Sequence, residues 1–566
     1  MLNGEFWMVK GGEARRSQTP GPSRTAEGIQ TSSHSTFSIH QSPFERRTTL
    51  ASLLVFGAAL VLYVTTLAPG LLWGGGDFAR FQTWAYLGHI EGKVDIFAHP
   101  LWVYVAHPFT WLPIRDPAWR ANFASAVFAA TALVFVFLSA GFLTRLRPAA
   151  LLATAALAVS HTFWTYAVMP KVYSLNALLL AACIYLLLRW RATSNERCLA
   201  LFGLLFGLSL LNHLVMATAA AGFAVFTIVT LWTHRRPVGR ALLIATASFG
   251  IGLAPYIYLM LRSTTAGATS DTVARFVVGL AYAFSHPTVL LKGCAWGVAL
   301  GLYQFPLSTV AGVLGLLLLW QRDIAMAAGI SLIMLGTVAF LLGALDPHAG
   351  STYVWNLHYY MQAYVAFALG MAPGFEILWT RWCSHVLYRQ AALMAATLIV
   401  PLVLYVGAPT VAPHLVRDIP DFRPLPGRDN FAYVLSPWKQ NEIGARTYGE
   451  RMLKALPEGS VLFADYGPWA IVRYLQVVEH ARPDVELVEL GSVDAQVGLI
   501  RRHGENPNLF LADTYRYYDL DGIRQHFDIV PAGPIYRLVP KSPSRNWSDN
   551  RQQRTDSRPI LDADRD

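Results

Sequence analysis

The sequence predicts an all-α polytopic membrane domain followed by a small C-terminal α/β domain. Of its 566 residues, 54% are hydrophobic and only 14% are charged, whereas an ordinary soluble chain has about 25% charged residues. Long apolar segments follow one another between residues 48 and 408, and 17 Trp residues fit rings that line membrane interfaces. Beyond residue 408, short apolar runs alternate with polar helical stretches, which is typical of a soluble α/β fold.

These patterns divide the chain into four parts. Residues 1–47 are polar and without periodicity, which indicates a disordered cytoplasmic tail. The membrane domain is expected over 48–408, the soluble α/β domain over 409–540 and a second disordered tail over 541–566. The first apolar run begins only near Thr48 and lacks a small-residue cleavage site, so a signal peptide is not predicted.

About eleven transmembrane helices are expected, because one crossing needs about 20 apolar residues. They are predicted over 49–68, 121–143, 149–167, 173–190, 198–212, 213–233, 241–261, 300–320, 324–345, 359–379 and 390–408. Two runs, 149–190 and 198–233, exceed a single crossing and carry polar interruptions, so each is expected to form a helical hairpin. Residues 280–305 could add an interfacial helix or a further crossing.

Basic residues gather between alternate crossings, as the positive-inside pattern requires. They assign the N-terminal tail and the loops near Arg145, Arg189 and Arg235 to the cytoplasm. Asp77 and Lys171 then fall on the opposite side. An odd number of crossings also brings residues 409–540 there. We therefore expect the chemistry and the soluble domain to share the non-cytoplasmic face.

The net charge of +10 does not indicate a nucleic-acid partner, because the basic residues lie between apolar runs and not in one patch. The expected partner is the lipid bilayer. The four Cys residues are scattered, without CxxC or metal-ligand spacing, so neither zinc nor a structural disulfide is predicted. No cofactor is predicted, and the dependence on a divalent metal stays open.

Asp77 is the most informative side chain, since it follows the first apolar segment in PGLLWGGGDFARFQTW (69–84). A carboxylate at the mouth of a membrane crossing is costly and is usually retained for function. The alternative is an ordinary cap of an interfacial loop. The glycines at 74–76 are not a nucleotide loop, because no strand–loop–helix context with Lys-Ser/Thr follows them.

The soluble domain is expected to be a small α/β sandwich. Its strands are predicted over 461–464, 485–490, 509–512, 529–531 and 535–538, and its helices over 441–455 and 467–479. Asp465 and Tyr466 follow the first strand, where loops often bind ligands, although a strand-end turn explains them equally well. We expect the domain to dock the acceptor.

Blocks along most of residues 50–490 resemble a known family. They read TLAPGLLWGGGDFARFQ, AHPLWVYVAHPFTWLP and DPAWRANFASAVFAA between Thr66 and Ala130, then SHTFWTYAVMPKVYSLNAL (160–178), GLSLLNHLVM (207–216) and YLQVVEHARPDVELVEL (474–490). In this order they resemble the large bacterial family of multi-spanning proteins related to the eukaryotic transmembrane protein O-mannosyltransferases of the GT-C superfamily.

The resemblance implies a GT-C fold and a membrane glycosyltransferase of the bacterial inner membrane, with its active site and C-terminal domain facing the periplasm or exterior. Such an enzyme moves a sugar from a polyprenyl-phosphate donor to a protein hydroxyl or a cell-surface glycan. In the family the first external loop supplies the catalytic carboxylate, and Asp77 occupies that position.

Sugar transfer by inversion needs a base for the acceptor proton and cationic or hydrogen-bonding groups for the departing phosphate. Asp77 is the predicted base. The predicted donor and phosphate contacts are Arg80, His99, Lys171, His213 and Arg262, and weaker substrate contacts are Tyr173, Asn212, Gln304, His358 and Tyr359. Structural alternatives remain for most of them: a turn at His99, a side chain reaching the headgroups at Lys171, a hairpin break at Asn212–His213 and a flanking charge at Arg262.

The chain departs from the family pattern in two places. Relatives commonly have Asp-Ser-Gly-Glu where this chain has Asp77-Phe78-Ala79-Arg80, and Ala-Glu-Val-Tyr where it has Pro170-Lys171-Val172-Tyr173. We hypothesise that the two acid-to-base changes replace an acidic contact with a cationic one, toward an anionic acceptor or a different donor sugar.

Two other functions stay open. A transporter or flippase of lipid-linked sugars would predict internal repeats, and none is seen. A catalytically inactive relative that serves in binding or assembly is suggested by Arg80, which replaces the usual acid.

Overall fold

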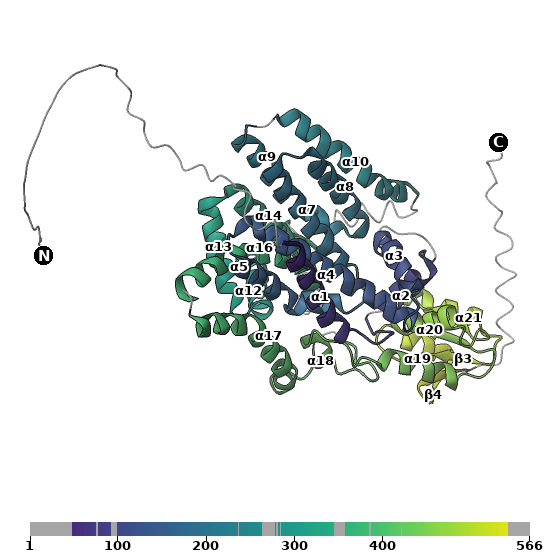
Figure 1. The fold of residues 1–566 in the computed structure, drawn as a ribbon. Helices are drawn as coiled ribbons and strands as arrows, with labels where there is room; N and C mark the ends of the chain where they lie inside the picture. The colour runs from purple at the N-terminus through teal and green to yellow at the C-terminus, as the bar shows by residue number, and fades with distance from the viewer. Residues whose placement is uncertain are drawn as a thin grey trace, which may run out of the picture. The chain divides into compact units, whose positions relative to one another are not determined.

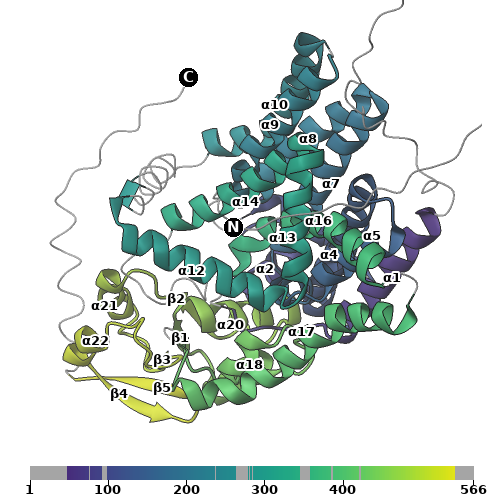
Figure 2. The ribbon, with the colours of Figure 1, turned by 90° about the vertical axis from the view of Figure 1, so that its left-hand side faces the viewer.

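The computed structural model describes residues 48–541 apart from 75–76, 92–98, 236, 263–277, 279–280, 283–284, 345–356, 384–385 and 420–421. The expected tail over 1–47 and all but the first residue of the one over 541–566 lie outside the described residues. The described chain forms a helical part followed by an α/β domain, coloured yellow-green to yellow in Figures 1 and 2.

The helical part consists, in chain order, of α1 (Thr48–Thr65), α2 (Asp77–Leu87), α3 (Pro100–Ala106), η3 (His107–Trp111), α4 (Pro117–Leu143), α5 (Arg147–Ala158), α6 (His161–Ala167), α7 (Tyr173–Thr193), α8 (Glu196–Asn212), η4 (Leu214–Ala219), α9 (Ala220–Thr233), α10 (Val238–Arg262), α12 (Pro287–Gln304), α13 (Ser308–Arg322), α14 (Ile324–Ala344), η5 (Leu357–Tyr360), α16 (Met361–Ile377), η6 (Leu378–Cys383) and α17 (Leu387–Leu415). A linker with α18 (Asn430–Leu435) leads to the α/β domain.

Within the described residues, eight helical segments are long and apolar enough to cross a bilayer, and the chain is an integral multi-pass membrane protein. A ninth crossing requires the pair Ala295–Gln304 and Ser308–Arg322, which is bent by 113°. Two further expected crossings, 198–212 and 149–167, are not among these segments. Helix α8 has 17 residues, and the segment 149–167 is divided between α5 and α6. The chain turns there because Ser160 adopts an extended conformation.

Helix α16 is the centre of the helical packing, and it contacts α13, α5, α14 and α4. Nearly every residue between Met361 and Phe375 is buried. The closest approach is to α13, where a methyl group on Gly374 would lie 1.8 Å from the carbonyl oxygen of Ala311. Small residues allow such close helix contact in membranes, where dispersion contacts replace the hydrophobic effect as the main attraction.

We expect Gly374→Ala to destabilise the helical part by about 1–3 kcal/mol. The added methyl group would overpack a backbone contact that cannot relax unless α13 and α16 move apart. The measurement is the thermal unfolding of the detergent-solubilised protein. Gly407→Ala in α17 is the matched control, since nothing lies within 4 Å of its added methyl group. Equal unfolding temperatures for the two variants would contradict the close contact.

The α/β domain contains the five predicted strands at their expected positions, which confirms the fold class. Its elements are α19 (Gly444–Ala455), β1 (Val461–Ala464), α20 (Tyr466–Glu479), β2 (Glu486–Glu489), α21 (Val493–Arg502), β3 (Leu509–Leu511), α22 (Leu520–His526), β4 (Phe527–Ala532) and β5 (Ile535–Pro540). The sheet order is β2-β1-β3-β5-β4. Strands β2, β1 and β3 are parallel, whereas β5 pairs antiparallel with β3 and β4.

The domain packs directly on the helical part, with α20 against α2 (Figure 1). One apolar core combines Leu71 and Trp73, which follow α1, with side chains of α19 and α20. Polar contacts accompany it: Arg473 pairs with Glu91 at 2.5 Å, and the backbone N–H of Ala118 donates to the Tyr474 hydroxyl at 2.9 Å. The carboxyl ends of the parallel strands therefore lie beside the beginning of α2.

Candidate functional site

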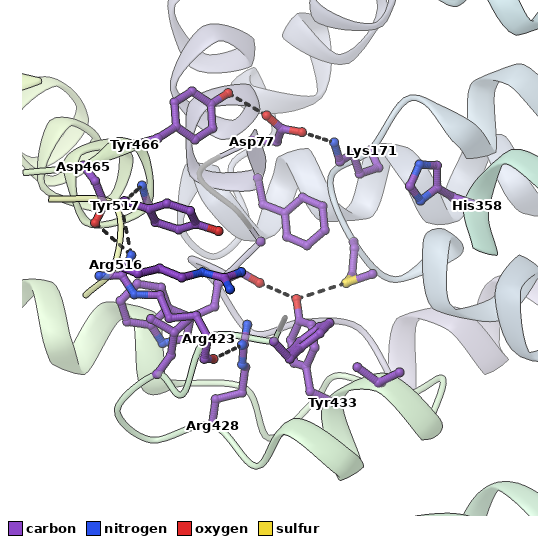
Figure 3. Close-up of a pocket in the computed structure, with 18 of the residues that line it drawn as sticks. Asp77, Lys171, His358, Arg423, Arg428, Tyr433, Asp465, Tyr466, Arg516 and Tyr517 are labelled. Carbon is purple, nitrogen blue, oxygen red and sulfur yellow. Dashed lines mark hydrogen bonds and ion pairs between the residues drawn. The ribbon is translucent and has the colours of Figure 1, made fainter. Parts of the chain in front are cut away.

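A cavity of about 880 Å³ lies between the helical part and the carboxyl edge of the sheet. The helical part lines it with Trp73, Asp77, Phe78, His161, Thr162, Thr165, Tyr166, Met169, Lys171 and His358, and the linker lines it with Arg423, Arg428 and Tyr433. The α/β domain adds Asp465, Tyr466, Glu489–Val493, Arg516 and Tyr517. Figure 3 shows Asp77 and Lys171 on one side of this space and the arginines on another. Open α/β sheets bind ligands at such a carboxyl edge.

Asp77 is the first residue of α2, where the helix dipole favours a negative charge. One carboxylate oxygen, Oδ2, pairs with the ammonium group of Lys171. The other, Oδ1, accepts a hydrogen bond of 2.6 Å from the Tyr466 hydroxyl. Burial raises the pKa of Asp77, but the charge of Lys171 and the two hydrogen bonds outweigh it, so the pKa is lowered. The carboxylate is thus kept ionised at the wall of the cavity.

Arg80, one turn further along α2, joins the two parts of the chain. Its guanidinium pairs with Glu489 at the end of β2 at 2.7 Å. It also lies over the ring of Tyr466, 4.0 Å from the centroid. Both cations that depart from the family pattern therefore meet an acid of the chain itself: Lys171 meets Asp77, and Arg80 meets Glu489. The hypothesis that they contact an anionic substrate stays a prediction.

Five of the predicted contacts form one cluster of rings behind Lys171. The rings of His99 and His213 stack with their centroids 4.7 Å apart, and Tyr173 lies beside His213. Tyr173 continues to His358 at 4.4 Å, and His358 contacts Tyr359. The cluster reaches the cavity through His358, whose Nδ1 lies 3.1 Å from the Tyr166 hydroxyl.

The remaining predicted contacts are placed differently. Asn212 is buried, and its side-chain amide donates to the Val172 carbonyl at 3.1 Å. The backbone carbonyl oxygen of Asn212 lies 2.8 Å from Nδ1 of His99. Gln304 accepts a hydrogen bond of 2.7 Å from the backbone of Thr162, so it contacts the wall of the cavity from behind. Arg262 lies at the exposed end of α10 over the ring of Tyr258 and does not line the cavity as far as the chain is described.

The linker contributes a charged group that the sequence did not suggest. Arg423 donates to both oxygens of Asp465, at 3.0 and 2.9 Å, and pairs with Asp513, which follows β3. Burial lowers the pKa of Arg423, but the two carboxylates outweigh it and raise the pKa. Burial raises the pKa of Asp513 despite the neighbouring guanidinium. The order of parallel strands could have predicted a site at Asp465, but no local signal pointed to the linker arginine.

Arg428 is the second cation missed by the sequence. Its Nε donates to the Asn430 side chain at 3.0 Å and its Nη2 donates to the Arg423 carbonyl at 2.8 Å. Its guanidinium also lies over the rings of Phe422 and Tyr433, 4.8 Å from each centroid. Burial lowers the pKa of Arg428, although the charge of Glu442 raises it in part. A partly buried cation at a cavity wall is suited to an anionic ligand group.

The arrangement combines an ionised carboxylate, a neighbouring ammonium group and arginines around one space. It can take a proton from a hydroxyl group and hold a phosphate, which are the two tasks of group transfer from a phosphate ester. Among the described residues, no three His, Cys, Asp or Glu side chains are grouped to hold a metal ion.

Comparisons with known proteins agree with this architecture. Residues 98–236 match the model of the protein O-mannosyl-transferase TMEM260 N-terminal domain family. The chain is 26% identical over 217 residues to the protein O-mannosyl-transferase TMEM260 of Mus musculus, which is 38% of this chain. The match spans about 30% of the length of that curated relative. The family match begins after Asp77 and Arg80.

The fold as a whole is similar to the crystal structure of ArnT from Cupriavidus metallidurans bound to undecaprenyl phosphate. The TM-score is 0.56 at 13% sequence identity, and the likeness covers 88% of this chain and 99% of that one. Together with the apolar helices and the α/β domain that packs on them, this defines a multi-pass membrane protein with the GT-C fold. In sequence, the chain is similar over part of its length to the TMEM260 protein O-mannosyl-transferases.

Proposed function

We propose that this protein is a membrane glycosyltransferase that moves a sugar from a polyprenyl-phosphate donor to a hydroxyl group, with inversion and with Asp77 as the base. One observation carries the proposal: the ionised carboxylate of Asp77 lines a cavity of about 880 Å³ and already binds both a cation and a hydroxyl group. During transfer, a base of this kind would also lie beside a cation, which binds the phosphate, and beside a hydroxyl group, which is the acceptor.

The comparisons support the classes of donor and acceptor. The solved structure of similar fold holds undecaprenyl phosphate, and the curated relative is a protein O-mannosyl-transferase. A protein hydroxyl is therefore the favoured acceptor, and a cell-surface glycan is the second choice. The sugar is not carried over, because Arg80 and Lys171 differ from the family pattern beside the base.

Lys171 has a role in the proposed reaction that follows from its contact with Asp77. While Asp77 is ionised, the ammonium group is neutralised by it. When Asp77 takes the acceptor proton, the carboxyl becomes neutral and the charge of Lys171 becomes available to the departing phosphate. Charge stabilisation would then rise as negative charge develops on the leaving group, which is the condition for accelerating a reaction.

Arg428 completes the proposed phosphate site. The other predicted cations are engaged or distant, since Arg80 is paired with Glu489 and Arg262 lies away from the cavity. Arg428 lines the same cavity from the linker. We place the donor phosphate between Lys171 and Arg428, with the lipid chain leaving along the helical part.

The position of the α/β domain supports its role in acceptor docking. Asp465, Tyr466 and Arg516 belong to this domain and line the cavity beside the base. Truncation after about residue 408 would remove that wall, so we expect it to abolish transfer to a protein acceptor. The charge pattern of the loops favours a position of this domain outside the cytoplasm, and the resemblance to the bacterial family favours the bacterial inner membrane.

The deciding experiment is sugar transfer by the purified full chain in liposomes. Undecaprenyl phosphate linked to radiolabelled mannose, glucose or galactose serves as the donor, and a Ser/Thr-rich peptide serves as the acceptor. Transfer by the wild type that is lost in Asp77→Asn supports the proposal. Asp77-independent transfer would overturn the role of the base, and no transfer from any of these donors would argue against the enzyme.

An inactive relative remains the second candidate, because the ion pair with Lys171 lowers the basicity of Asp77. Such a protein would bind a lipid-linked sugar without consuming it. Donor binding by the wild type and by Asp77→Asn with equal affinity, and no turnover by either, is the result expected for that function.

The ion pair also predicts a change in the pH profile of transfer. The pKa of Asp77 is lowered in the folded protein, so the base is active above that pKa and transfer is lost as the pH falls through it. Lys171→Gln removes the positive charge that lowers the pKa of Asp77. We therefore expect the acid limb of the profile to move to higher pH by about one unit or more. Lys171→Arg keeps the charge and should retain the wild-type limb. A limb that is identical in all three proteins would show that Asp77 is not the titrating base.

A further inference from the structure

Both oxygens of the Asp77 carboxylate are occupied in the structure. The Lys171 ammonium binds Oδ2, and the Tyr466 hydroxyl donates to Oδ1 at 2.6 Å, as Figure 3 shows. An acceptor hydroxyl must make the same kind of hydrogen bond to a base before its proton can be taken. On Oδ1 the partner is already a hydroxyl group, so the Tyr466 hydroxyl lies in a position that an acceptor hydroxyl can take.

Tyr466 can leave this position without unfolding the domain. It is the first residue of α20, and the helix is fixed by Asp465, whose side chain accepts from the backbone of Gly467 at 3.0 Å. Its side chain is only partly buried and lines the cavity. A rotation about its side-chain bonds moves the hydroxyl into the cavity while the helix stays in place, and the ring then gives up its contact with the Arg80 guanidinium.

The exposed surface of Asp77 gives a reason to protect this base from water. Asp77 keeps 44% of its side-chain surface exposed, and this surface faces the cavity, where water can enter. A water molecule on Oδ1 would be a competing nucleophile. Its proton would pass to Asp77, its oxygen would bond to the anomeric carbon, and the bond from that carbon to the phosphate oxygen would break. The products would be free sugar and polyprenyl phosphate, and the donor would be wasted.

We propose that the Tyr466 hydroxyl occupies the acceptor position on Asp77 and keeps water from it until the acceptor hydroxyl displaces the tyrosine. Tyr466 thereby sets the choice between transfer and hydrolysis of the donor. This inference rests on the proposed function and adds a specificity-determining residue from the α/β domain. It also assigns a purpose to the contact between α20 and the first turn of α2.

The test compares Tyr466→Phe with the wild type in liposomes that contain the labelled undecaprenyl-phosphate sugar that the wild type uses. Release of free labelled sugar is measured without acceptor, and transfer is measured with a saturating Ser/Thr-rich peptide. A hydrogen bond to a charged group changes an equilibrium about tenfold. We therefore expect Tyr466→Phe to raise acceptor-free release about tenfold and to lower the KM for the peptide, with kcat retained.

Tyr474→Phe is the matched control. Tyr474 belongs to the same helix and its hydroxyl also binds the helical part, at the backbone of Ala118, but it does not line the cavity. If a loosened contact between the two parts caused the leak, Tyr474→Phe would leak as well. We expect its release and transfer to match the wild type. Adding Asp77→Asn to Tyr466→Phe should abolish the extra release.

Other outcomes overturn the inference. A parallel fall of release and transfer in Tyr466→Phe would show that Tyr466 only orients the base, and unchanged release would show that water is excluded by other means. In either case Asp77-dependent transfer by the wild type would leave the proposed function standing. Absence of that transfer in the wild type would overturn both the proposed function and the inference about Tyr466.

Discussion

Replacing Asp77 with Asn is expected to slow sugar transfer by roughly 10²- to 10⁴-fold, the usual contribution of a positioned base. The amide has nearly the same shape, and its oxygen can still accept from Tyr466 or Lys171. It cannot take a proton at neutral pH. The loss should therefore appear in kcat, while binding of the donor is retained, because the interaction removed is one made in the transition state.

Asp116→Asn is the control for this variant. Asp116 caps α4 by accepting from the backbone of Trp119 at 2.9 Å, and Asn caps a helix about as well as Asp. It lies outside the cavity lining. Retained transfer in Asp116→Asn together with a loss in Asp77→Asn would separate chemistry from folding. A loss below about threefold in Asp77→Asn would remove Asp77 from the role of base.

Replacing Arg423 with Met is expected to destabilise the α/β domain by about 3–5 kcal/mol, because removing one partner of a buried ion pair leaves uncompensated charge. Asp465 is 6% exposed and Asp513 is 23% exposed, so neither carboxylate is well hydrated once the guanidinium is gone. Two carboxylates that share a site repel each other. The effect is therefore expected to be smaller near about pH 5 than near about pH 8, since protonation of one carboxyl removes the repulsion.

The measurement is thermal unfolding of the solubilised full chain, combined with limited proteolysis to locate the change in the α/β domain. Arg524→Met is the control, because Arg524 is 57% exposed and its contact with Asp521 is 3.6 Å long. Surface pairs of this kind contribute little. The same unfolding temperature for both variants would show that Arg423 does not hold the linker to the ends of β1 and β3.

The sequence predicted the fold better than it predicted the number of crossings. The five strands follow from short apolar runs bounded by turn residues, and β1 is buried along its whole length, as expected for an inner parallel strand. The hydrophobicity of segment 149–167 predicts one crossing, but the polar sequence at Ser160–Thr162 breaks it into α5 and α6. Hydrophobic length alone cannot distinguish a crossing from two helices that turn inside the protein.

The site was predicted in part, and the missing part came from segments distant in sequence. His99, His213, Tyr173 and His358 were proposed one by one, and the structure joins them through ring contacts. Arg423 and Arg428 were not proposed, because an arginine in a polar linker has no local pattern that separates it from a solvated charge. Their burial depends on the α/β domain folding back over the helical part.

The sequence by itself determined that this is a multi-pass membrane protein with an α/β domain and a costly carboxylate at Asp77. Apolar length, strand periodicity and the free-energy cost of a charge near lipid are local properties, so they can be inferred from neighbouring residues. Only the tertiary structure decided which charges neutralise one another. Lys171 and Tyr466 lie 94 and 389 residues from Asp77 along the chain, and electrostatic partners are set by distance in space, which the order of residues does not contain.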